Sequence, residues 1–274
     1  MIRITHHVVP DLLQPHLWPL LEQQLEEAVP RQASSGISQL GRWIEALIGS
    51  AGRFAAHGDI AGARRRLSAS AECIGAVFTP VAVDGLVHFP FDGRVLSGPR
   101  SSRLSAANSL NWILGFCMAS SFRNTGVLRA LDAYSKEDLA KSGADYDVYA
   151  DSLSEGMRAL FRNDAGWRGW LKSAEVQSRA ENLQAPPSII ARYRALIPML
   201  QAIGDKDQSA FDDACVDAVK AHKALYGRGS QKTSPSGAYA ILAAGVAALG
   251  VDRGLTFNVE SGYTPRWLVY GGEP

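Results

Sequence analysis

The sequence predicts a mainly α-helical protein, an irregular and α-solenoid-like stack of antiparallel helix pairs. Apolar residues recur every three or four positions through most of the 274 residues, which is the spacing of one buried helix face. Two short segments show strand signals instead, a hairpin near residues 82–96 and a strand near 255–260. No exact repeat of roughly 34 to 45 residues is present, so a regular repeat array is not predicted. We expect residues 1–274 to form a single helical domain.

The N-terminal third is expected to be an arm followed by three helices. Residues 1–19 contain Pro10, Pro15 and Pro19, so they should be extended. Asp59 stands where an N-cap is needed, directly after Gly58, and therefore marks the turn of a helical hairpin. The predicted helices cover about residues 20–29, 37–57 and 60–78.

The predicted hairpin interrupts the helices. Its sequence VAVDGLVHFPFDGRVL contains two Asp-Gly pairs between strand-forming residues, and Pro90 limits its strand to a sheet edge. We expect it to pair with, or lie beside, the strand near 255–260. Helical spacing then resumes, with a kink expected at Pro198. The predicted helices cover about residues 104–122, 128–134, 137–141, 146–162, 167–174 and 190–200.

The C-terminal quarter, residues 205–268, is expected to be the centre of the fold. The segment FDDACVDAVKAHKALYG has one apolar stripe at helical spacing and ends at Gly227. Residues 238–249 are apolar on every face, so they should be a buried helix, too short for a bilayer that needs about 20 residues. In LTFNVE, apolar and polar residues alternate as in a strand.

Composition indicates a protein without a strongly charged partner. Lys and Arg number 28 against 27 Asp and Glu, a net charge of +1, which gives no reason to expect nucleic acid or a membrane surface as partner. The three cysteines, Cys73, Cys117 and Cys215, share no short spacing, so they should be buried thiols in a reducing compartment. The N-terminus lacks the pattern of a secretory signal. We therefore expect a cytoplasmic protein.

No arrangement of residues predicts catalysis, a metal or a cofactor. Cys215 and His222 lie two helical turns apart, about 10 Å, whereas a nucleophile and its base need roughly 3 Å. His6 and His7 are adjacent in an extended arm, so their side chains should point to opposite faces. The loop 227–237 follows a helix and lacks the spacing of a phosphate-binding loop. We therefore expect a protein that is not an enzyme.

Three irregular elements are the predicted contact surfaces for a partner: the hairpin at 84–98, the acidic turn and helix at 143–155, and the loop at 227–234. Acids at a helix start also favour the helix dipole, so the acidic cluster has a structural explanation beside cation binding or nucleic-acid mimicry. Of Trp167 and Trp170, we expect at least one in the core and allow the other to be a binding anchor. The candidate binding residues are Asp84, His88, Asp92, Arg94, Asp145, Asp147, Asp151, Glu155, Arg228 and Lys232.

The C-terminal quarter resembles the immunity protein 49 family of bacterial polymorphic-toxin systems. The resemblance covers about residues 97–268 and is most specific in the segment V-E-S-x-Y-x-P, here Val259 to Pro265. Further matches are His222, Lys223, Asp252, Arg253 and Gly254, and upstream Trp112, Arg123 and Asn124. The resemblance implies that the chain binds and inhibits a cognate toxin encoded by a neighbouring gene.

Two other functions remain open at the level of the sequence. One is a helical scaffold that binds host proteins or peptides, which a gene neighbourhood without a toxin gene would favour. The other is an undetected hydrolase using His222 or an acidic pair, which requires these groups to lie in a cleft. The leading prediction is an immunity protein that binds its toxin stoichiometrically and covers its active site.

Overall fold

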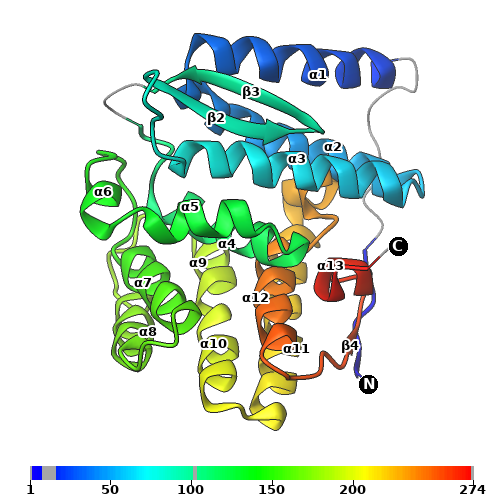
Figure 1. The fold of residues 1–274 in the computed structure, drawn as a ribbon. Helices are drawn as coiled ribbons and strands as arrows, with labels where there is room; N and C mark the ends of the chain where they lie inside the picture. Colours follow the sequence, from blue (N-terminus) through cyan, green and yellow to red (C-terminus); the bar gives the residue numbers. More distant parts are fainter. Residues whose placement is uncertain (1, 8–16, 101–103, 273–274) are drawn as a thin grey trace.

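The fold is mainly helical, as the sequence predicts, in a computed structural model that describes residues 2–7, 17–100 and 104–272. Figure 1 shows α1, the hairpin β2–β3 and α3 across the top of the molecule, with α10, α11 and α12 upright beneath them. Sequential helices form antiparallel pairs, α2 with α3, α7 with α8 and α10 with α11. The helices are α1 (Trp18–Ser35), α2 (Gly41–Ala56), α3 (Ile60–Phe78), α4 (Ser109–Phe122), α5 (Thr125–Ala133), α6 (Lys136–Ala140), α7 (Tyr149–Phe161), α8 (Trp167–Gln177), α9 (Pro187–Arg194), α10 (Leu196–Asp205), α11 (Gln208–Tyr226), α12 (Ile241–Asp252) and α13 (Arg266–Tyr270), with short 3-10 turns at Ile37–Leu40, Gly229–Thr233 and Pro235–Gly237.

Two local signals explain helix boundaries that the sequence analysis placed differently. Pro19 lies in the first turn of α1, where a missing N–H costs nothing, so this helix starts earlier than expected. Residues 1 and 8–16 of the predicted arm lie outside the described residues. The predicted kink at Pro198 is a break between α9 and α10 at Ala195, because proline cannot donate to the carbonyl four residues back.

The hairpin is confirmed, with β2 (Leu86–Phe91) antiparallel to β3 (Arg94–Pro99). Asp92 and Gly93 both have positive φ, 49° and 77°, which is the conformation that a two-residue hairpin turn requires. One face of the hairpin packs on α1 and α3. Gly98 allows this approach, because a Cβ there would lie 1.7 Å from the backbone oxygen of Ala33.

The predicted pairing of the two β-segments is wrong. Strand β4 (Val259–Glu260) pairs in parallel with β1 (Ile2–Arg3), and the hairpin forms a separate sheet. The alternation over residues 255–260 is real, since Leu255, Phe257 and Val259 are buried. Only the last two residues are a strand, because only they lie beside β1. Figure 1 shows that this pairing brings the N-terminal strand beside the C-terminal segment.

Helix α12 is the centre of the core. It packs on α4, α10, α11 and α13, and all its residues from Ile241 to Gly250 are buried. The window Pro235–Asp252 is long and apolar enough to cross a membrane by length and composition alone, contrary to the expectation from residues 238–249 that this helix is too short. Most of this window is buried inside the protein, which explains its apolar composition.

Candidate binding surfaces

The residues that carry the sequence resemblance hold the helices together. Asp252, at the end of α12, accepts hydrogen bonds from Arg123 at 3.0 and 3.3 Å and so ties α12 to α4. Arg253 donates to the carbonyl oxygen of Leu160 at 2.5 Å and to Asn163 Oδ1 at 2.9 Å, at the C-terminal end of α7. Free carbonyls at a helix end need such donors. These residues are therefore part of the scaffold.

Two other residues of this set, Lys223 and Tyr263, bind the N-terminal segment to the body. Lys223 donates to the backbone and side-chain oxygens of Thr5, each at 2.8 Å. Tyr263 is buried and hydrogen-bonds to His7. The rings of His6 and His7 both contact Tyr263, so the expectation that they point to opposite faces is wrong. The turn after β4 places Tyr263 between them and His222.

His222 is a buried neutral histidine. Its Nε2 bonds to the carbonyl oxygen of Gly237 at 2.9 Å. Burial, with the nearby positive charge of Arg192, lowers the pKa of His222 to about 3 from its ordinary value of 6.5. Its neighbour on the same helix face, Cys215, is also buried, and burial raises the pKa of that thiol. Both residues thus have the structural roles that the sequence analysis favoured.

We expect this histidine to make the protein less stable in mild acid. Below pH 6.5 the unfolded chain protonates His222, whereas the folded chain does not until the pH approaches 3. Between pH 7 and pH 5 the contribution of His222 to the free energy of unfolding should fall by about 2 kcal/mol. Urea denaturation at the two pH values measures this loss. His222→Gln keeps an N–H donor for Gly237 and cannot titrate, so an equal loss in this variant would contradict the prediction.

The four predicted binding residues on the hairpin do not all face solvent. Asp84 and His88 are exposed and share a hydrogen bond of 2.8 Å, and Arg94 is exposed. Asp92 instead turns toward α3, where Arg65 lies 3.9 Å away and the backbone N–H of Asp92 donates to Glu72 at 2.9 Å. Three of the four thus remain available to a partner.

Most of the predicted acidic cluster is used inside the chain. Asp147 is buried and accepts the backbone N–H groups of residues 184 and 185 at 2.7 and 3.1 Å. Asp151 accepts the hydroxyls of Ser109 and Tyr146, and Glu155 pairs with the buried Arg158 at 2.5 Å. Asp145 is exposed and accepts from Gln184. Their role in binding stays a prediction, and their observed role is to hold α7 in place.

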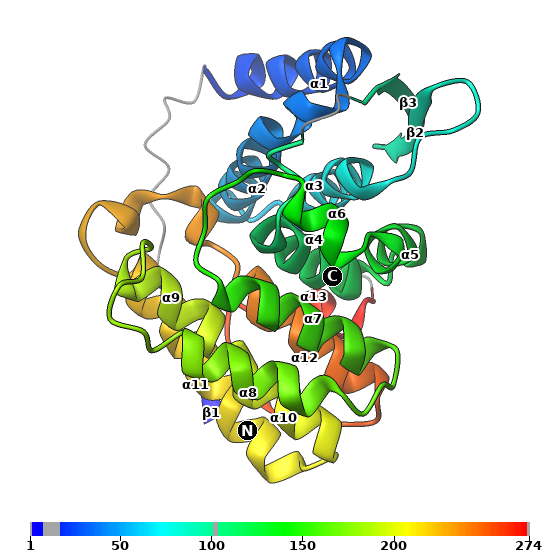
Figure 2. The same ribbon diagram turned by 90° about the vertical axis from the view of Figure 1, so that its left-hand side faces the viewer.

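Arg228 and Lys232 are exposed on the loop after α11. Figure 2 shows this orange segment and the hairpin on opposite sides of the molecule. The ten predicted residues therefore do not converge on one site.

A groove along α3 is a surface that the sequence analysis did not find. Three adjoining pockets of about 670, 390 and 460 Å³ follow α3, with β2 on one side and α5 on the other. We call this surface the α3 groove, and its central part is lined by apolar atoms of Ala76, Phe89, Pro90, Val127 and Ala130. His88 and Asp92 belong to its wall. No local sequence pattern predicts it, because three separate elements form it.

Exposed apolar side chains lie in the hairpin and in the residues just before it. Val81, Val83 and Val95 are all exposed large hydrophobic residues, and Val81 lines the groove at its far end. Large exposed apolar patches mark interaction sites in soluble proteins. The role of the hairpin in binding stays a prediction, and that prediction named only charged residues and His88.

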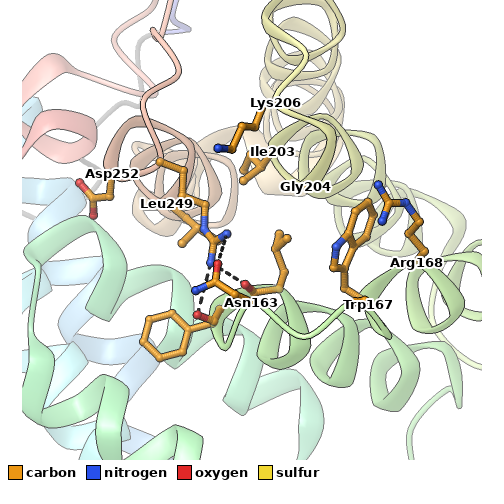
Figure 3. A pocket seen from close by; sticks show the side chains of 12 residues that line it. Asn163, Trp167, Arg168, Ile203, Gly204, Lys206, Leu249 and Asp252 are labelled. Atoms are coloured by element: carbon orange, nitrogen blue, oxygen red, sulfur yellow. Dashed lines mark hydrogen bonds between the residues drawn. The ribbon is translucent and has the colours of Figure 1, made fainter.

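A second surface is a pocket of about 650 Å³ where the ends of α7, α10 and α12 meet the start of α8. Three cations line it, Arg168, Lys206 and Arg253, against one carboxylate, Asp252. We call it the basic pocket. Figure 3 shows Lys206 above the pocket, Arg168 beside Trp167 on the right, and Asp252 on the left. Its apolar part includes Trp167, which is buried, whereas Trp170 is partly exposed, as expected for one of the two tryptophans.

The described residues hold no group of three or more His, Cys, Asp or Glu side chains that could bind a metal ion. The three cysteines are buried and free of disulfides, in agreement with their predicted role as small apolar residues. Burial raises the pKa of each thiol, so none is a ready nucleophile.

The fold and these surfaces define a helical protein that carries hollowed faces on a buried helical core. The chain belongs to the immunity protein 49 family, whose family model matches residues 61–268. The match begins at the start of α3 and includes the hairpin, so it extends further toward the N-terminus than the resemblance over about 97–268. Comparisons with curated proteins and with solved structures found no match.

Proposed function

We propose that this chain neutralises one bacterial toxin by direct stoichiometric binding, without catalysis, and covers the active site of that toxin. The observation that carries the proposal is the match to the immunity protein 49 family over residues 61–268. The toxin is expected to be encoded by a neighbouring gene. Binding is expected in the cytoplasm of the producing cell, where a toxin that enters from a competitor would act.

The architecture supports inhibition by binding. A rigid helical body loses little conformational freedom when it binds, so most of its contact energy is available for affinity. The α3 groove, the exposed hairpin residues and the basic pocket all belong to the region that matches the family. Residues of the family resemblance such as Arg253 and Tyr263 act in the scaffold, so differences in toxin specificity should lie on these surfaces.

Co-expression tests this proposal. Cells that express the neighbouring toxin domain should stop growing, and co-expression of this chain should restore growth and yield a complex that co-purifies. Persistent growth arrest, with no complex at micromolar concentrations, would exclude the immunity function.

A titration in vitro separates binding from catalysis. With tight one-to-one binding, half an equivalent of this chain should leave about half of the toxin activity, however long the mixture is incubated. Progressive loss of the remaining activity would instead indicate an enzyme. His222→Gln should inhibit as well as the unchanged protein, because His222 is buried and bonded to Gly237.

A further inference from the structure

We propose that the basic pocket binds an acidic segment of the toxin, with Lys206 as the residue that contacts its carboxylate. This inference rests on the function proposed above and names the chemistry of the partner. The pocket lining carries three cations and a single carboxylate, and its volume is about 650 Å³, enough for several side chains of a partner.

Of the three cations, only Lys206 lacks an internal partner among the described residues. Arg253 is bonded to the end of α7, and Arg168 pairs with Asp205 at 2.6 Å while its guanidinium stacks 4.3 Å over the ring of Trp167. The carboxylate of Asp252 is occupied by Arg123 at 3.0 Å. The side chain of Lys206 extends over the pocket in Figure 3. An incoming carboxylate would therefore find an uncompensated positive charge beside two fixed ones.

The backbone at Lys206 strengthens this inference. In the described part of the chain, three residues other than glycine that follow helix ends adopt left-handed conformations: Arg123 after α4, Asn163 after α7 and Lys206 after α10, with φ of 49°, 59° and 56°. Glycine adopts this conformation at a lower cost. Arg123 donates to Asp252, and Asn163 accepts from Arg253. These contacts explain why these two residues, and not glycine, occupy their positions. Lys206 has no such internal role, so its side chain is best explained by an external ligand.

The α3 groove does not select a partner by charge in the same way. Most of its charged groups are paired within the chain, such as Arg64 with the carbonyl oxygen of Gly272 at 2.6 Å and Arg65 with Glu26 at 3.4 Å, and only Arg129 on α5 has no partner among the described residues that line it. Its centre is apolar and would accept apolar side chains of many partners. Charge complementarity thus favours the basic pocket as the place where an acidic segment is recognised.

The test uses the full chain and the toxin domain of the neighbouring gene, with affinity and association rate measured by surface plasmon resonance. Lys206→Glu should raise the Kd at least tenfold and slow association, with a weaker salt dependence than the unchanged protein. Lys206→Gly removes the cation and keeps the left-handed backbone. It should bind more weakly while its Tm stays equal or rises.

The matched control is Lys220→Glu, which makes the same charge change on the exposed face of α11, about 18 Å along the helix from its start. Its Kd should change less than threefold. If the unchanged protein binds and Lys206→Glu binds equally well, the pocket assignment is wrong and the immunity function stands. If the unchanged protein neither binds nor protects, both proposals fail.

A cross-link identifies the chemistry of the partner directly. A carbodiimide joins an amine to a carboxylate as an amide with loss of water, so it should couple the Nζ of Lys206 to an Asp or Glu of the toxin. Mass spectrometry of the digested complex should find this peptide pair in the unchanged protein. A complex in which Lys206 remains unmodified, or is readily modified by an acylating reagent, would overturn the assignment.

Discussion

Gly245→Ala is expected to destabilise the protein by about 3 kcal/mol or more, because the added methyl group has no space in the core. Gly245 lies in the middle of α12, where this helix crosses α4. A Cβ at this position would lie 2.2 Å from the carbonyl oxygen and 2.3 Å from the Cα of Cys117. These are backbone atoms, so relief requires one whole helix to move away from the other. Thermal unfolding should show a decrease in Tm of about 6–12 °C.

Gly169→Ala is the matched control, the same substitution within helix α8. Apart from the neighbouring residues and backbone of its own helix, no described atom lies within 4 Å of a Cβ built at Gly169. Alanine is favoured over glycine in a helix by about 1 kcal/mol, so this variant should be more stable than the unchanged protein. If both variants melted at the temperature of the unchanged protein, the close crossing of α4 and α12 would be wrong.

This crossing also determines the position of the basic pocket. The end of α12 carries Asp252 and Arg253, which connect to α4 and α7. A displacement of α12 from α4 would therefore separate the residues that line the pocket. Gly245→Ala should therefore weaken toxin binding indirectly, by moving the helices that form the pocket. Lys206 is exposed, so substitutions of Lys206 test the pocket without moving these helices.

Features with a local cause could be predicted from the sequence. The apolar stripe of α11 and the buried helix α12 follow from residue spacing alone, and the hairpin turn follows from the Asp92-Gly93 pair. The segment from Val259 to Pro265, where the resemblance is most specific, packs into the core through Val259 and Tyr263, which are buried.

Features that depend on distant parts of the chain could not be predicted in this way. Strand β4 pairs with β1, and the partners Val259 and Ile2 are separated by nearly the whole chain. Both hollowed surfaces combine segments from several helices. The acidic residues Asp147 and Asp151 look like a solvated cluster in the sequence, and only tertiary contacts show that they hold neighbouring segments. Pairing and burial of this kind have no local sequence signal.

The burial of the three consecutive arginines at 64–66 could not be predicted from the sequence either. Side-chain exposure separates them, since Arg65 is 49% exposed and Arg66 is 0% exposed. Arg66 donates through Nε to Glu22 at 2.7 Å and through a terminal nitrogen to Glu26 at 2.9 Å, so it joins α3 to α1. Glu22 also accepts the hydroxyl of Ser50 in α2, at 2.6 Å. One buried cation thus connects three helices.

Arg66→Gln is therefore expected to lower the free energy of unfolding by about 3 kcal/mol, because it leaves the largely buried carboxylate of Glu22 and the partly exposed one of Glu26 without this counter-charge. Removal of one partner from a buried ion pair usually costs about 3–5 kcal/mol. Glu26 is 45% exposed and solvent screens its carboxylate, so we expect a cost at the lower end of this range. Arg65→Gln makes the same change at the neighbouring exposed position and should cost less than 1 kcal/mol. Urea denaturation of both variants measures the difference.

The same pair of variants tests how α1 contributes to the binding surfaces. Helix α1 lies outside the region that matches the family, yet it packs on β3 and supports the face of the hairpin opposite its exposed residues. If Arg66 anchors α1, Arg66→Gln should increase hydrogen exchange in both α1 and the hairpin, and Arg65→Gln should not. Unchanged protection of α1 in Arg66→Gln would show that apolar packing alone holds this helix.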